Sequence, residues 1–141
     1  MSAIPFPLEI VIEGTPVSQG GSSSSRARWI DRIRASTQAR LRELSDWEWL
    51  DDRPVAVTIF YSSSAGMQGD VDNIIKPILD GMKHVVYPDD GVVERVLAQR
   101  FEPGLLWEIQ TQSVQMMNAL GATPPLVYIG VDDDLSWWLL S

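Results

Sequence analysis

Five aspartates fall within 21 positions near the middle of the chain: Asp70, Asp72, Asp80, Asp89 and Asp90. Carboxylates that lie close together repel one another unless a cation lies between them. Mg²⁺ prefers oxygen ligands, retains several waters, and accepts few protein carboxylates together with substrate phosphate. A site of this kind suits phosphodiester hydrolysis, because the metal can activate water and stabilise charge on the attacking and leaving oxygens.

The spacing of these residues indicates which of their side chains would lie on the same side of the backbone. Asp70 and Asp72 are two positions apart, so an extended backbone would point both side chains to one side. Asp72, Lys76 and Asp80 are each four apart and would share one stripe of a helix. Lys76 could then neutralise charge on a scissile phosphate.

Two simpler interpretations of the aspartates remain open on spacing alone. Asp72 could be only the N-cap of a helix, since aspartate is favoured there. The run from Asp89 to Gly91 could be only a turn, because aspartate and glycine form turns. A calcium-binding EF-hand loop starting at Asp70 is excluded. Its sixth position, which requires glycine, is Ile75, and its twelfth position, which requires glutamate, is Gly81.

The run DVDNIIKPILDGMKHVVYPDDGVV, residues 70–93, resembles the RusA family of crossover-junction endodeoxyribonucleases. The signature of that family is a D-x-D-N-x-x-K-x-x-x-D-A-L helix, then a short hydrophobic segment ending in D-D and a strand that contains valine. The matching residues are Asp70, Asp72, Asn73, Lys76, Asp80, Tyr87, Asp89, Asp90 and Val93. A lone D-x-D-N would be a weak signal, whereas its combination with the lysine and the later aspartate pair is more specific. The order upstream also fits, with a strand ending in Gly-x-Pro (Gly14, Pro16), a loop, a basic helix and a second strand.

The resemblance implies a homodimer that places two active sites against a four-way DNA junction. Such enzymes cut two strands of like polarity symmetrically, using Mg²⁺ or Mn²⁺. Position by position, it implies that Asp70, Asp72 and Asp90 are catalytic metal-binding carboxylates and that Lys76 is the catalytic lysine. Asp89 is a further expected metal ligand or only shapes the turn, and Asp80 is expected to be structural.

Charge argues both for and against a DNA partner. The net charge is −8 and the sequence pI is about 4.4, and duplex DNA repels an acidic body on average. Residues 26–42, however, hold six arginines against one acid, Asp31. The expected DNA-binding residues are Arg26, Arg28, Arg32, Arg34 and Lys76. Because the pI is low, one alternative is a catalytically weak or inactive RusA-like module with a nucleic-acid-binding or regulatory role. Carboxylate chemistry alone would also allow a second alternative, a phosphohydrolase that acts on small substrates.

Hydrophobic patterning predicts one α+β domain over residues 1–141, with a mixed β-sheet and two main helices packed on it. The two main helices are 26–44, which would carry the arginines, and 70–85, which would carry Asp70, Asp72 and Asp80; Ser25 would cap the first. A shorter helix is expected over 114–120. The expected strands are 8–14, 55–61, 92–101, 105–112 and 126–131, with 92–101 and 105–112 forming a hairpin and 132–141 an acidic and apolar tail.

Composition limits the chemical groups that the site can contain and the expected location of the protein. Cysteine is absent, so no thiolate can bind metal or act as a nucleophile. No apolar run approaches the ~20 residues that cross a bilayer, and residues 1–7 show no signal peptide. A cytoplasmic protein without membrane partners is therefore expected.

Overall fold

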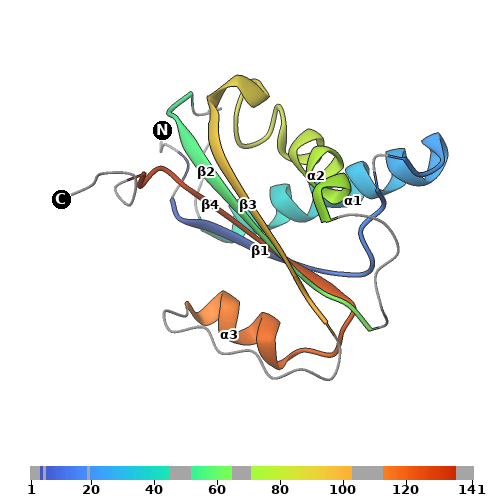
Figure 1. Ribbon diagram of the computed structural model, residues 1–141. Coiled ribbons are helices and arrows are strands. Elements are labelled where there is room, and N and C mark those ends of the chain that lie inside the picture. The colour runs from blue at the N-terminus through green and yellow to red at the C-terminus, as the bar shows by residue number, and fades with distance from the viewer. Residues whose placement is uncertain are drawn as a thin grey trace.

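The computed structural model describes residue 4 and residues 6–18, 20–44, 52–64, 71–102 and 113–135. Within these ranges a mixed four-stranded sheet carries helices α1 and α2 on one face and α3 on the other (Figure 1). The strands lie in the order β1-β4-β2-β3. Their bounds are Leu8–Glu13 for β1, Val55–Ser62 for β2, Val93–Phe101 for β3 and Leu126–Asp132 for β4. The predicted α+β fold, with two main helices on a mixed sheet, is confirmed.

Strand pairing explains the hydrophobic patterns. β4 lies between β1 and β2 and is antiparallel to both, so its residues from Leu126 to Val131 are all buried. β2 and β3 are parallel, which requires a crossover connection, and α2 lies in that connection. The predicted hairpin partner of β3, residues 105–112, lies outside the described residues.

Helix α1, Ser23–Leu44, packs a stripe of Trp29, Ile33, Thr37 and Leu41 against the sheet. It begins three residues before the predicted start. The Ser22 hydroxyl accepts a hydrogen bond from the Ser25 amide at 3.2 Å, so Ser22 is the N-cap and the prediction of Ser25 is wrong. Residues 22–25 are all serine, and so residue type alone could not select among them.

Helix α2, Ile75–Met82, follows a 3₁₀ turn, η1, over Val71–Ile74. The sequence predicted a single helix to residue 85, but Lys83 is extended and His84 lies in the left-handed region at φ 65°. The helix ends there because the next three residues, 85–87, are all buried, and a helix could not turn three consecutive side chains to one core.

Helices α1 and α2 approach closely at Gly81. A Cβ atom on Gly81 would lie 2.6 Å from Cβ of Ile33 and 3.1 Å from the carbonyl oxygen of Ile30. At the preceding residue, Nη2 of Arg34 donates to the carbonyl oxygen of Asp80 at 3.0 Å. The backbone of α2 is therefore fixed against α1 at Asp80 and Gly81.

Helix α3, Val114–Gly121, lies on the opposite face of the sheet. Ser113 caps it by accepting from the Met116 amide at 3.1 Å. The Ser113 hydroxyl also donates to Glu9 of β1, and the Tyr128 hydroxyl of β4 donates to the same carboxylate at 2.6 Å. This cluster joins α3 to the sheet. None of the helices in the described part of the chain is long and apolar enough to cross a membrane.

Candidate active site

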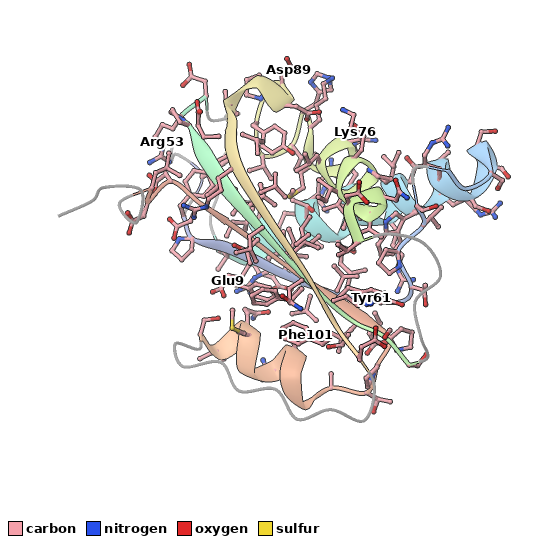
Figure 2. All side chains as sticks on the ribbon, in the orientation of Figure 1. Glu9, Arg53, Tyr61, Lys76, Asp89 and Phe101 are labelled. Carbon is pink, nitrogen blue, oxygen red and sulfur yellow. The ribbon has the colours of Figure 1, made fainter. Side chains whose placement is uncertain are left out.

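Lys76 joins two carboxylates that are distant in the sequence. Its Nζ lies 2.8 Å from Oδ1 of Asp80, one turn later on α2, and 2.6 Å from Oδ2 of Asp90. Asp90 begins a short 3₁₀ helix, η2, Asp90–Val92, which leads directly into β3. Figure 2 shows Lys76 and Asp89 on the α1 and α2 side of the sheet, whereas Glu9 and Phe101 lie toward α3. The helix of the crossover connection and the end of that connection, just before β3, therefore meet at Lys76.

The surroundings of Lys76 hold its ammonium charged. Hydrogen bonds to Asp80 and then to Asp90 raise the pKa of Lys76 well above its ordinary value, although partial burial opposes the shift. The side chain is still 51% exposed, so a ligand arriving from solvent can reach it. The site thus offers a permanent positive charge beside two carboxylates.

The two carboxylate oxygens of Asp90 differ in their partners. Oδ2 accepts from Lys76, whereas Oδ1 is buried and has no hydrogen-bond partner within the described ranges. A buried polar atom without a partner is costly, so Oδ1 is expected to have a partner other than the described residues. A divalent cation would satisfy a carboxylate oxygen of this kind.

Asp72 is the expected metal ligand that the structure describes just before α2. Asp72 is an exposed residue of η1, and the N-cap position of α2 belongs to Ile74, so the N-cap interpretation of Asp72 is wrong. Asp70 lies outside the described residues. Among the residues that are described, no three His, Asp or Glu side chains are grouped closely enough to hold a metal. A site shared by Asp70, Asp72 and Asp90 therefore stays a prediction; its all-oxygen donors and the unpartnered Oδ1 fit Mg²⁺ or Mn²⁺.

Asp89 is directed to a different lysine. Its Oδ1 lies 3.3 Å from Nζ of Lys83, and this contact lowers the pKa of the Asp89 carboxyl. The Val92 amide donates to the Asp89 carbonyl oxygen at 3.3 Å and closes the turn into β3. Asp89 thus shapes the turn, and its role as a metal ligand stays a prediction.

Tyr87 fixes the segment between α2 and Asp90. The side chain is fully buried, and its hydroxyl donates to the carbonyl oxygen of Leu79 at 2.8 Å. Burial raises the pKa of Tyr87, and the negative charges of Asp90 and Asp80 raise it further. The aromatic residue of the signature therefore anchors the returning chain on α2 and helps to place Asp90 beside Lys76.

The arginines of α1 divide by environment. Arg28 and Arg32 are exposed, and the Arg32 guanidinium lies against Gly14, where it borders an open pocket lined also by Glu13, Thr123, Pro124 and Pro125. Arg26 donates to the Gly21 carbonyl oxygen at 3.2 Å, and Arg34 is engaged with Asp80. Contact of the four arginines with DNA stays a prediction, and Arg34 has a packing role in addition.

Sequence reasoning expected Asp80 to be structural, yet its carboxylate contacts Lys76, the expected catalytic lysine, directly. The four-residue spacing from Lys76 is the signal that indicates this contact. The bond from Arg34 to Asp80 spans 46 positions, and no local pattern could have indicated it.

Comparison with protein families gives one clear result. Residues 27–110 match the family model described as Endodeoxyribonuclease RusA. The match covers more than half of the chain, from α1 through β3, and includes Asp70, Asp72, Lys76 and Asp90. Neither the curated proteins nor the solved structures that were compared with the chain gave a match.

Proposed function

Because the chain belongs to the RusA family of endodeoxyribonucleases, we propose that it cuts four-way DNA junctions by metal-dependent hydrolysis of phosphodiester bonds. The observation that carries the proposal is the Lys76 ammonium held against Asp90, whose second carboxylate oxygen is buried and has no partner among the described residues. A fixed cation beside a carboxylate with coordination to spare suits a phosphate substrate together with a divalent metal.

The proposed roles follow the chemistry of each side chain. Asp70, Asp72 and Asp90 would hold Mg²⁺ or Mn²⁺, with Asp89 as a further candidate ligand. The bound metal would supply an activated water and stabilise charge on the leaving oxygen. Lys76 would place its ammonium against a non-bridging oxygen of the scissile phosphate, where negative charge increases in the transition state.

Binding of the junction would depend on the arginines of α1. Arg26, Arg28, Arg32 and Arg34 would contact phosphates, together with Lys76 at the cut site. We propose a homodimer, because two sites are needed to nick two strands of like polarity symmetrically. Because these phosphate contacts would release counterions from the DNA, affinity would fall steeply as salt rises.

The test is cleavage of a synthetic four-way junction in Mg²⁺ or Mn²⁺. The wild-type protein is expected to give paired symmetric nicks, and Asp72→Asn to abolish them while circular dichroism and the melting temperature stay unchanged. Asp133→Asn is the matched control, because it also removes one carboxylate charge, from a residue paired at 2.6 Å with Arg53. No cleavage of junction, flap or fork DNA with either metal would overturn the proposal.

The acidic composition favours one alternative, a family member that binds nucleic acid but has lost cleavage. Tight, salt-dependent binding of the junction without cutting would support it. A titration at low and moderate salt, run beside the cleavage assay, separates the two functions.

A further inference from the structure

We propose that Asp80 is the positioning residue for the catalytic lysine, holding the Lys76 ammonium in the site while Asp90 binds the metal. The inference rests on the proposed function, because it takes Asp90 as a metal ligand. It begins from the two distances at Lys76 Nζ, 2.8 Å to Asp80 and 2.6 Å to Asp90.

Asp90 cannot serve both cations equally. When its oxygens bind a divalent ion, the ion attracts the carboxylate charge and repels the nearby ammonium. With Asp90 as its sole partner, Lys76 would either compete with the metal or leave for water. A second carboxylate outside the metal site removes this conflict, and Asp80 lies within hydrogen-bonding distance.

The backbone of Asp80 is fixed more firmly than an exposed ion pair requires. Arg34 of α1 donates to the Asp80 carbonyl oxygen at 3.0 Å, and Gly81 packs against Ile33 without room for a Cβ. The Asp80 side chain is only 31% exposed. The carboxylate therefore has a defined position one helical turn from Lys76, as a positioning residue requires.

The chain has an unusual advantage for a test, because Lys76 and Lys83 are its only lysines. An ammonium group held in an ion pair exchanges its protons slowly enough to be followed by NMR of ¹⁵N-labelled lysine. Lys76 can be assigned by its loss in Lys76→Met, and the remaining ammonium signal then belongs to Lys83. Binding of Mg²⁺ is followed in the same samples by the backbone amide signals of Asp72 and Asp90.

The expected pattern has three parts. In the wild-type protein the Lys76 ammonium signal persists at saturating Mg²⁺. In Asp80→Asn it is present without Mg²⁺, because Asp90 still holds the lysine, and is lost when Mg²⁺ is added. In Asp80→Glu it is retained, which excludes a mere loss of fold.

Cleavage gives a second readout. Asp80→Asn is expected to lower kcat by about tenfold or more without raising KM for the junction, since it misplaces a group used in the transition state. Glu43→Gln, which breaks an exposed ion pair with Arg40 at the end of α1, is the charge-matched control and leaves cleavage unchanged.

The outcomes that contradict the inference differ from those that contradict the proposed function. Loss of the wild-type Lys76 signal on Mg²⁺ binding, or its persistence in Asp80→Asn, overturns the role of Asp80 and leaves a metal-dependent nuclease intact. Amide signals of Asp72 and Asp90 that do not respond to Mg²⁺ or Mn²⁺ overturn the metal site and this inference with it.

Discussion

Tyr87→Phe tests how the segment that delivers Asp90 is held on α2. The Tyr87 hydroxyl donates to the Leu79 carbonyl oxygen at 2.8 Å, and that oxygen also accepts from the Lys83 amide at 3.1 Å. The substitution deletes one buried hydrogen bond but leaves the carbonyl with a partner. We therefore expect a loss of about 1 kcal/mol in the free energy of unfolding at pH 7.

Alkaline pH should reverse this difference. Burial, and then the charges of Asp90 and Asp80, raise the pKa of Tyr87 above the ordinary value near 10, so the phenol ionises in the unfolded chain but not in the folded protein. The folded state then binds one more proton, and stability falls by about 1.4 kcal/mol per pH unit above pH 10. Phenylalanine lacks this term. At pH 11 the variant should be as stable as the wild type, or slightly more stable.

The measurement is urea unfolding of the wild type and Tyr87→Phe at pH 7 and between pH 10 and 11. Equal m-values allow their free energies of unfolding to be compared at each pH. Tyr128→Phe is a parallel case on the opposite face of the sheet, because burial and its bond to Glu9 also raise the pKa of Tyr128. The two substitutions should add. A stability difference between Tyr87→Phe and wild type that stays near 1 kcal/mol from pH 7 to pH 11 would refute the reasoning.

Three further substitutions test the local geometry. Gly81→Ala should cost about 1–3 kcal/mol in urea unfolding, because the new Cβ would lie 2.6 Å from Ile33, and an unchanged midpoint would contradict this packing. His84→Gly should stabilise by up to about 1 kcal/mol by relieving the left-handed φ of 65°, so a lower melting temperature would count against it. Lys83→Ala should raise the pKa of Asp89 toward its ordinary value in an NMR titration and leave stability almost unchanged, because Asp89 is exposed; an unmoved Asp89 pKa would contradict the ion pair.

The sequence predicted the helices and strands correctly where the spacing of apolar residues fitted only one kind of element. Alternation over residues 8–14 indicated β1, which ends one residue earlier at Glu13, and the stripe through Ile33, Thr37 and Leu41 indicated α1. The end of α2 was missed because Val85 continues the helical spacing of Ile78 and Met82, although the chain has already left the helix. A strained residue such as His84 at the point of departure has no signal in a single sequence.

Pairings between distant segments were the other limit. The contact of Lys76 with Asp80 could be predicted because it lies within one helical turn. Its contact with Asp90 depends on how residues 83–89 return to α2, and parallel pairing of β2 with β3 depends on the whole crossover connection. Local propensity predicts neither the contact of Lys76 with Asp90 nor the pairing of β2 with β3. The family signature was therefore a stronger guide to Asp90 than any local pattern.

The most direct test of the central claim, that Asp70, Asp72 and Asp90 share one divalent cation, is the anomalous scattering of Mn²⁺ in crystals of the protein. The account predicts a manganese peak at bonding distance from oxygens of Asp72 and Asp90, with the Lys76 ammonium against Asp80. A map from Mn²⁺-saturated crystals with the site open to solvent and no peak between these carboxylates would contradict it.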